Sequence, residues 1–351
     1  MNYRLQVADL AAIETRVGAW LAECKDLNDV FVPYTDQFGQ FQPLGRDPYI
    51  AFAVKMYGGN YDSLYVDYKG ANGKDRKGDA KRKRQISKPG VLGAIYRLSG
   101  GELVNVYDPK DPEVVLYTKK TGLWAYSDAM GIEMSQEQAH EIVRIFRDSY
   151  PEICNANKND GPLGIWKRLE EAVADVMHPD HPQTVRYIGP NNAVKIDRLN
   201  LVGRHPIMRM QLPSGRYLHY IDAHLAPTKM AWTQKDEDGE DVPVYKDALV
   251  YGGTDQKTKQ WNSKITTHGG KLFENLVQAI ARDILGYCMV QMEEKEMNLV
   301  GHVHDEAISL VEDDLLSPTI SEMVEIMSQE IPWAKGLLLG ADGFSGSYYR
   351  K

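Results

Sequence analysis

Two carboxylate clusters lie almost three hundred residues apart in this 351-residue chain, and each borders strand-like sequence. Asp9 ends a segment, residues 3–9, in which apolar and polar residues alternate with the period of a strand. Asp305 and Glu306 interrupt a mostly apolar stretch, residues 299–310, which predicts a hairpin with the acidic pair at its tip. Ionised carboxylates in apolar surroundings are costly without compensation. We therefore expect the two clusters to meet around bound cations.

Magnesium ions would supply that compensation. Mg²⁺ prefers oxygen ligands and is held by one or two carboxylates together with substrate phosphates. Two such ions, about 3.5–4 Å apart, stabilise the attacking and leaving oxygens of a phosphoryl transfer. The expected metal ligands are Asp9, Asp305 and the backbone carbonyl of Leu10. A plain polar hairpin turn is one alternative, and a transition-metal site at His302 and His304, which should point the same way along a strand, is another.

A strongly basic tract precedes residues suited to phosphate binding. Residues 69–88 contain nine Lys or Arg and two Asp. Arg84, Lys88 and Tyr96 are spaced by multiples of four, so on a helix they lie near one side. Because a proline inside a helix costs about 3 kcal/mol, we expect the regular helix to begin at Pro89, with Lys88 at its N-terminus, a favourable phosphate site. A solvated basic loop followed by an ordinary amphipathic helix remains the alternative.

Other segments follow recognisable patterns. Ser135 and Gln138 form a capping box before an amphipathic helix that ends at Tyr150. After a helix through residue 22, we expect a long middle section of weak strand character, which contains the apolar run at 50–56 and a linker at 70–78. The remaining expected features are a helix at 162–176, a turn at 213–215, strands at 216–220 and 248–251, an acidic loop at 236–241 and a helix at 271–292.

The net charge of −8 does not exclude nucleic acid, because the acidic residues concentrate at 236–241 and 293–296, away from the basic tract. Three widely spaced cysteines indicate neither a disulfide framework nor a zinc knuckle, and favour a reduced, cytoplasmic protein. No apolar run reaches about eighteen residues, so we expect no membrane span.

Three motifs, in this order, resemble those of the family A DNA polymerases, the group of bacterial DNA polymerase I and many phage replicases. Residues 9–16, DLAAIETR, resemble motif A, D-x-S-x-I-E-x-R. The spacing Arg84-x3-Lys88-x7-Tyr96 resembles motif B, and His-Asp-Glu at 304–306 resembles motif C. The resemblance covers nearly the whole chain and has a phage character.

The resemblance implies a role for each matched residue. Asp9 and Asp305 would hold two Mg²⁺ ions, for which Mn²⁺ can substitute, with Glu306 as an assisting carboxylate. Lys88 would protonate the leaving pyrophosphate. The residues implied in dNTP binding are Arg84, Lys88, Leu92, Tyr96, Leu10 and Glu14, the last as a steric gate against a ribose 2′-hydroxyl. The residues implied in primer or template contact are Arg16, Glu274, Gln278, Arg282 and His304.

Four features depart from the family pattern. Ala11 replaces the usual serine of motif A, and Leu92 stands where an aromatic residue is frequent. Pro89, Gly90 and Gly93 weaken the expected helix. Motif A also starts close to Met1, so we expect neither thumb nor exonuclease in this chain, and a separate subunit that supplies them.

The expected fold class is α/β, of the α+β kind, with an antiparallel palm sheet and a helical fingers subdomain. The expected palm comprises residues 1–16 and 211–351, including the hairpin at 299–310, and the fingers comprise residues 17–210. The expected activity is template-directed DNA synthesis on primer-template DNA with dNTPs. The alternatives are a non-catalytic replication or DNA-binding subunit that retains the fold, a single-subunit RNA polymerase relative, which Glu14 disfavours, and a metal-dependent nuclease.

Overall fold

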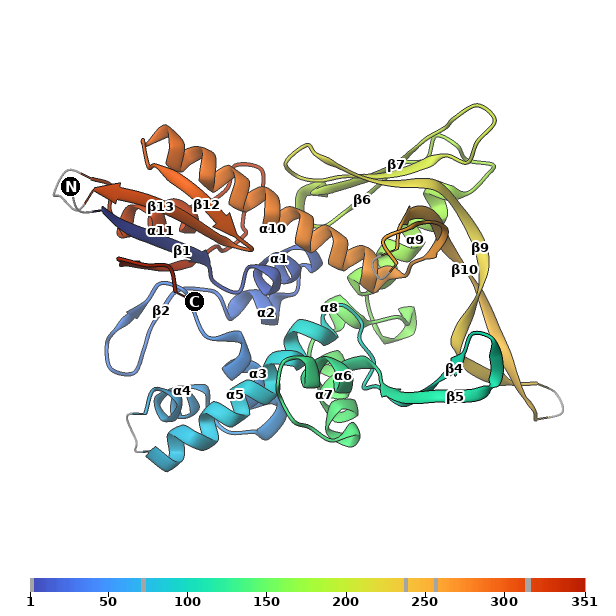
Figure 1. Ribbon diagram of the computed structural model, residues 1–351, viewed down its shortest axis with the longest axis horizontal. Coiled ribbons are helices and arrows are strands. Elements are labelled where there is room, and N and C mark those ends of the chain that lie inside the picture. The colour runs from blue at the N-terminus through green and yellow to red at the C-terminus, as the bar shows by residue number, and fades with distance from the viewer. Residues whose placement is uncertain (1–2, 71–73, 237–238, 256–257, 313–316, 351) are drawn as a thin grey trace. The chain divides into compact units, whose positions relative to one another are not determined.

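The computed structural model describes residues 3–70, 74–236, 239–255, 258–312 and 317–350. The chain divides into two units, the first formed by residues 1–153 and 277–351 and the second by residues 154–276. Each unit combines helices with an antiparallel sheet, so the fold is of the α+β kind (Figure 1). None of the described helices has the length and hydropathy needed to span a bilayer.

A four-stranded antiparallel sheet organises the first unit, in the order β12-β13-β1-β14. Its strands are β1 (Tyr3–Leu10), β12 (Leu299–Val303), β13 (Glu306–Glu312) and β14 (Ala341–Gly346). The helix α11 (Ile320–Ser328) packs against β1 and β14. The predicted first strand and the predicted hairpin are therefore confirmed, and they lie side by side because β1 pairs with β13.

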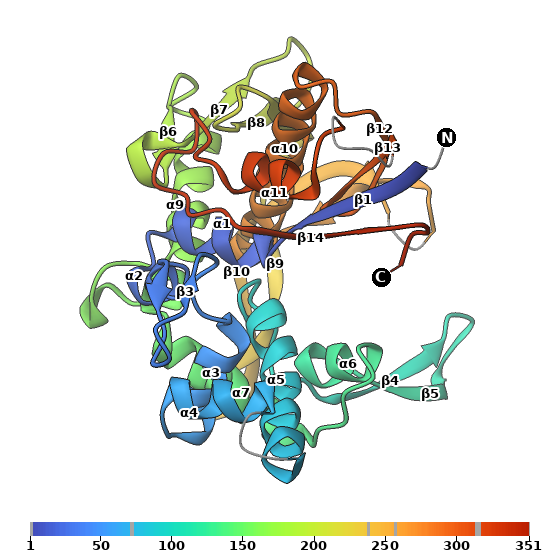
Figure 2. The ribbon, with the colours of Figure 1, turned by 90° about the vertical axis from the view of Figure 1, so that its left-hand side faces the viewer.

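The helices of the first unit lie mostly between β1 and β12 in sequence. They are α1 (Ile13–Ala22), α2 (Lys25–Asp29), α3 (Pro48–Tyr57), α4 (Tyr61–Lys69), α5 (Lys74–Ala94), α6 (Gly122–Ala129), α7 (Gln136–Ser149) and α8 (Pro151–Cys154), with short hairpins formed by β2 (Tyr34–Thr35) with β3 (Phe41–Gln42) and by β4 (Leu103–Asp108) with β5 (Asp111–Lys120). Figure 2 shows α3, α4 and α7 gathered around α5, which contacts all three.

The expected strand character at 50–56 is wrong, since this segment lies in α3. A side-chain oxygen of Asp47 accepts hydrogen bonds from the backbone N–H groups of Tyr49 and Ile50, at 2.9 and 3.0 Å, and Pro48 occupies the first helical turn. This is a strong helix start. The apolar run was therefore a buried helix face, which periodicity alone does not separate from a strand over so short a length.

The expected helix start at Pro89 is also wrong. Helix α5 begins at Lys74 inside the expected linker, of which residues 71–73 lie outside the described part, and Pro89 stands in the helix interior. Lys88 is consequently an interior residue and not an N-terminal one. The cost of the proline is offset by packing of α5 against α3, α6 and α7. A hydrogen bond two residues before Pro89 is part of this packing: the Ser87 hydroxyl donates to the carbonyl oxygen of Tyr49 on α3 at 2.6 Å.

A six-stranded antiparallel sheet forms most of the second unit, with its strands adjacent in sequence order. They are β6 (Arg186–Ile188), β7 (Val194–Leu199), β8 (Ile207–Gln211), β9 (Tyr217–Lys235), β10 (Asp241–Thr254) and β11 (Trp261–Thr266). The helix α9 (Ile165–Met177) packs on this sheet. The strands expected at 216–220 and 248–251 are parts of the longer β9 and β10. Residues 237–238 of the expected acidic loop lie outside the described part.

The other expected helices are confirmed. Ser135 and Gln138 form the capping box of α7, which ends before Tyr150, and the helix expected at 162–176 is α9. The helix expected at 271–292 is α10 (Gly269–Glu294). The two units divide the chain at positions other than the expected palm and fingers boundaries at 16/17 and 210/211, and those boundaries stay predictions.

Substitution of two glycines of α5 by alanine should change the free energy of unfolding in opposite directions. A Cβ at the buried Gly90 would lie 2.6 Å from Ile142 Cγ2 and 3.0 Å from the Phe52 ring, whereas a Cβ at the exposed Gly78 would meet nothing within 4 Å. We expect Gly90→Ala to lower the free energy of unfolding by about 1–3 kcal/mol through overpacking. Gly78→Ala should raise it by about 1 kcal/mol through helix propensity. Denaturant unfolding of both variants tests this, and equal shifts would contradict the close packing of α5.

Candidate functional site

Acidic residues from three strands meet at one end of the sheet of the first unit. Asp9 on β1 lies directly opposite Glu306 on β13 and directly opposite Asp342 on β14. The N–H of Leu10 donates a hydrogen bond to the carbonyl oxygen of Asp305 at 3.2 Å. Side chains of directly opposed residues share one face of a sheet. The strand register therefore brings together the two clusters that are distant in the sequence.

Asp342 was missed by the sequence analysis. It lies on β14 and is exposed, and its Oδ1 accepts a hydrogen bond from the N–H of Gly343 at 2.8 Å. Its place opposite Asp9 depends on the pairing of β14 with β1. Like charges directly opposed across strands are destabilising. No local sequence pattern marks this residue, because only the strand register makes it a neighbour of Asp9.

The carboxylates of motif C differ in their surroundings. Glu306 is buried, with 7% of its surface exposed, and its Oε2 accepts a hydrogen bond from the hydroxyl of Tyr349 at 2.6 Å. This hydrogen bond to a carboxylate raises the pKa of Tyr349 above its ordinary value. Asp305, like Asp9, is only half-buried. Glu306 is thus held by the protein, while Asp9 and Asp305 stay accessible to solvent.

The accessible carboxylates fit magnesium better than a transition metal. Within the described residues, no three His, Cys, Asp or Glu side chains are grouped as a complete metal site. Magnesium does not require such a group, because it is held by one or two carboxylates together with waters and substrate phosphates. His302 and His304 do not share a strand face as expected, since β12 ends at Val303 and His304 adopts a left-handed backbone with φ of 53°.

The turn of motif A is held by Arg16. Its three guanidinium nitrogens donate to the carbonyl oxygens of Ala11, Leu338 and Leu44, at 2.7, 2.9 and 2.8 Å respectively. The guanidinium also stacks 4.3 Å from the centroid of the Phe31 ring. Arg16 is 3% exposed, and its burial lowers its pKa to about 10. The expectation that Arg16 contacts primer or template is therefore corrected, because this guanidinium binds the protein's own backbone.

Motifs A and B meet through one hydrogen bond. The hydroxyl of Tyr96 donates to Oε2 of Glu14 at 2.9 Å, although the two residues are 82 positions apart. Glu14 lies in the first turn of α1. This helix begins directly after Ala12, whose φ of 52° turns the chain from β1 into the helix. Tyr96 lies just beyond the end of α5 at Ala94. The two residues expected to shape one nucleotide pocket are thus in direct contact.

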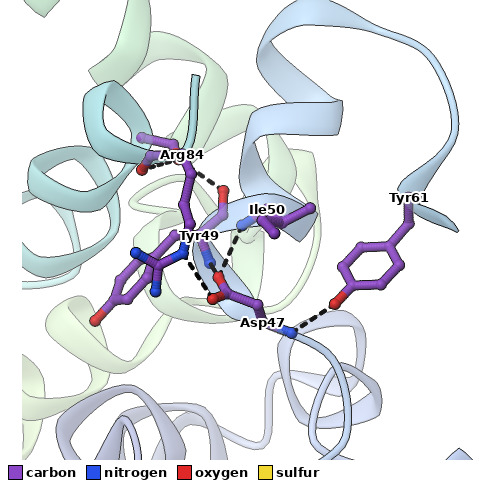
Figure 3. Close-up of polar contacts among 6 residues, drawn as sticks. Asp47, Tyr49, Ile50, Tyr61 and Arg84 are labelled. Atoms are coloured by element: carbon purple, nitrogen blue, oxygen red, sulfur yellow. Dashed lines mark hydrogen bonds and ion pairs between the residues drawn. The ribbon is translucent and has the colours of Figure 1, made fainter. Parts of the chain in front are cut away.

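The guanidinium of Arg84 is paired in this structure. Its Nε donates to Oδ2 of Asp47 at 2.8 Å, and its Cζ lies 5.1 Å from the ring centroids of both Tyr49 and Tyr68. Figure 3 shows Arg84 beside Tyr49, facing the carboxylate of Asp47. Burial acts to lower the pKa of Arg84, but the carboxylate of Asp47 outweighs it and the pKa is raised. Asp47 thus joins the start of α3 to a cation of α5.

Lys88 and Leu92 follow Arg84 at successive four-residue steps along α5, and both are half-buried. The ammonium of Lys88 lies 5.8 Å from the Tyr49 ring centroid and has no carboxylate partner among the residues that the structure describes. A cation placed beside aromatic faces, without a counter-ion, is suited to an incoming phosphate.

The residues expected to contact primer and template are mostly on the surface. Gln278 and Arg282 of α10 are exposed, as is His304 beside the hairpin tip. Glu274 is partly buried and forms an ion pair with Lys271 at 2.9 Å. Lys271, Gln278 and Arg282 are thus exposed along α10, and the contact of Glu274, Gln278 and Arg282 with DNA stays a prediction.

Two substitutions at Asp47 separate its role as a helix cap from its role as a counter-ion. Asp47→Ala removes both and should lower the free energy of unfolding by about 1–2 kcal/mol from the cap alone. Asp47→Asn keeps a good cap and loses only the ion pair with Arg84, so its loss should be below about 1 kcal/mol. Denaturant unfolding at neutral pH measures both. A loss from Asp47→Asn as large as that from Asp47→Ala would contradict the capping role.

The acidic end of the sheet, the contact between Glu14 and Tyr96 and the cations of α5 all lie in the first unit. In sequence, the chain is similar to the DNA polymerase of Bacillus phage SP02, with 33% identity over 187 residues. The matched region is 53% of this chain and 26% of the relative, so the chain spans about a quarter of the length of the curated relative that it matches. No protein-family model matches the chain.

Among solved structures, the polymerase domain of Pol1 from M. smegmatis, in complex with DNA primer-template and dNTP, is similar over 98% of this chain and 39% of its own. The TM-score is 0.45 and the sequence identity 13%. A score of this size does not establish a shared fold. The similarity to the phage enzyme is therefore the finding that supports the resemblance to phage-type family A polymerases.

Proposed function

We propose that this chain catalyses template-directed DNA synthesis, the transfer of a nucleotide from a dNTP to the 3′-hydroxyl of a primer. The observation that carries the proposal is the register of β1 with β13, which places Asp9 next to the Asp305–Glu306 pair. The contact between Tyr96 and Glu14 supports it. So does the sequence similarity to a phage DNA polymerase.

Asp9 and Asp305 would hold two Mg²⁺ ions, with the Leu10 carbonyl as a further oxygen ligand. Bound there, the ions supply charge stabilisation for the attacking and leaving oxygens of an in-line displacement. Glu306, buried on the same sheet face as Asp9 and held by the hydroxyl of Tyr349, would assist the pair as a neighbouring carboxylate.

The face of α5 would bind the triphosphate. The primer 3′-oxygen, having lost its proton to solvent, bonds to the α-phosphorus while the bond from that phosphorus to the pyrophosphate oxygen breaks. Lys88, which has no counter-ion among the described residues, approaches the phosphates and donates a proton to the leaving pyrophosphate. Arg84 exchanges its Asp47 partner for a phosphate oxygen, and the rings of Tyr49 and Tyr68 keep its guanidinium plane oriented during the exchange. Leu92, one turn further along, adds an apolar contact beside the nucleotide.

Glu14 and Tyr96 would close the pocket around the sugar and the new base pair. The hydrogen bond from Tyr96 holds the Glu14 carboxylate in one place, so a ribose 2′-hydroxyl would meet it. This arrangement favours a DNA polymerase over an RNA polymerase relative. A replication subunit without activity is the remaining alternative, and it leaves the accessible Asp9 and Asp305 without a role.

In this proposal, residues 1–16 and 211–351 serve as palm and residues 17–210 as fingers, and Gln278, Arg282, Glu274 and His304 contact primer-template DNA. A cytoplasmic location fits DNA synthesis. A separate subunit that supplies a thumb or an exonuclease stays a prediction, and primer extension by this chain with and without candidate partners tests it, since processive synthesis unaided would contradict the need for one.

Substitution of the accessible carboxylate tests the chemistry. Asp305→Asn should reduce the rate of primer extension with Mg²⁺ by at least about 100-fold, because stabilisation by a metal ligand is worth several kcal/mol and each 1.4 kcal/mol is tenfold. Asp148→Asn on α7, an exposed carboxylate of the same unit, is the matched control and should extend normally. Circular dichroism confirms folding of both variants. Unimpaired extension by Asp305→Asn would refute the proposed function.

Substitution at the sugar contact tests substrate choice. Glu14→Ala should raise the incorporation of ribonucleotides relative to deoxyribonucleotides, because it removes the carboxylate that meets the 2′-hydroxyl. Tyr96→Phe removes only the hydroxyl that donates to Glu14 and should give a smaller change in the same direction. The measurement is the ratio of kcat/KM for dNTP and rNTP, and an unchanged ratio for Glu14→Ala would count against this assignment.

A further inference from the structure

An open groove lies on the sheet of the second unit, with a volume of about 890 Å³. Its floor is a rung of three strands, in which Val250 on β10 lies opposite His224 on β9 and Thr266 on β11. The loop between β7 and β8 forms one wall, and a hydrogen bond from the N–H of Ala223 to the carbonyl oxygen of Pro206, 2.8 Å long, ties this loop to β9. All residues that line the groove belong to the second unit.

The groove is rich in hydrogen-bond donors. Its charged and ring-bearing lining residues are Arg204, His205, Asp222, His224, Lys229 and Lys264. Asp222 is the single carboxylate among the lining residues. The hydroxyls of Ser263 and Thr266 add further donors, while that of Thr228 donates to the carbonyl oxygen of Ala226 at 3.2 Å. Such a surface is complementary to an anion with several oxygens.

Among the residues that the structure describes, the cations of the groove have no counter-ions. Arg204, Lys229 and Lys264 are exposed, and within the described part of the chain none of them forms an ion pair. Several basic residues elsewhere on this unit are paired, for example Arg186 with Asp175 at 2.9 Å and Lys235 with Asp241 at 3.0 Å. Three unpaired cations around one groove, in a chain of net charge −8, concentrate positive potential at this place.

An aromatic platform stands beside these cations. The imidazole rings of His205 and His224 are stacked, with centroids 4.5 Å apart and planes inclined by 22°. His224 is further oriented by a contact of 3.0 Å between its Nδ1 and the carbonyl oxygen of Asp222, a residue with a left-handed backbone at a bulge of β9. Cations beside a stacking surface are the usual elements of a single-strand binding site, because the phosphates meet the cations and the bases stack on the rings.

We propose that this groove binds single-stranded DNA, with backbone phosphates on Arg204, Lys229 and Lys264 and a base against the His205–His224 stack. The identity of the bound strand rests on the proposed function: in a DNA polymerase, it would be the unpaired template. The contact would hold template on the second unit, in addition to the residues of motifs A, B and C.

The test is equilibrium binding of fluorescein-labelled oligo-dT to the whole chain over a range of salt, without Mg²⁺ or dNTP. We expect the triple variant Arg204→Ala/Lys229→Ala/Lys264→Ala to bind about tenfold more weakly at low salt. The slope of log Kobs against log[salt] should fall in magnitude by about 2, since each lost phosphate contact on a single strand contributes about 0.7. A second variant, His205→Ala/His224→Ala, should lower affinity and leave the salt slope unchanged.

A control triple variant removes the same charge from paired, exposed positions of the same unit, Lys158→Ala/Arg186→Ala/Lys235→Ala. It should retain the wild-type affinity and slope. Equal losses in both triple variants, or an equal loss of blunt duplex DNA binding in the groove variant, would overturn the proposal. The proposal would also be overturned if polyglutamate competed as effectively as unlabelled oligo-dT, because the groove would then bind any polyanion.

The outcome is separable from that of the proposed function. Asp305→Asn, the variant used to test primer extension, should bind oligo-dT as the wild type does, since Asp305 lies outside the groove. Loss of oligo-dT binding in the groove variant, with unimpaired extension by Asp305→Asn, would support the groove and refute the polymerase proposal. Extension by the wild type, together with unchanged oligo-dT binding in the groove variant, would support the polymerase proposal and refute the groove.

Discussion

The antiparallel pairing of β1 with β13 is the constraint on which the rest of the site depends. It joins residues from the two ends of the chain, and its register sets Asp9 against Glu306 and beside Asp305. A shift by one residue would send Asp9 to the opposite face of the sheet. The buried residues of β1 hold that register, because Val7 and Ala8 point to opposite faces, both are almost fully buried, and a slip would exchange the environments that fit them. Burial thus positions the carboxylates.

Charged groups of the first unit are stabilised in three different ways. The buried guanidinium of Arg16 is surrounded by carbonyl oxygens and an aromatic ring. Arg84 is paired with Asp47, and Glu306 accepts a hydrogen bond from Tyr349. Lys88, by contrast, lies beside the Tyr49 ring and has no counter-ion among the described residues. The difference separates groups that hold the fold from groups that are available to a substrate, and sequence motifs alone do not make this distinction.

Tertiary packing overrode local preference at two places. The segment 50–56 is helical because Asp47 and Pro48 start a helix whose apolar side is buried by α5. Helix α5 continues through Pro89 because contacts with α3, α6 and α7 stabilise it along its length. Propensity is a weak guide when a helix is buried on several sides. The same packing leaves no room for a side chain at Gly90.

The sequence by itself determined the first strand, the hairpin near the C-terminus, the long helices with clear caps or periodicity, and the candidate residues of the three motifs, because these follow from local patterns. Only the tertiary structure decided that Asp342 lies opposite Asp9, that Arg84 is held by Asp47, that Arg16 is buried, and that His205 stacks on His224. Each of these is a contact between segments distant in sequence, set by strand register or helix packing. A local sequence pattern does not specify which distant segment a residue will contact.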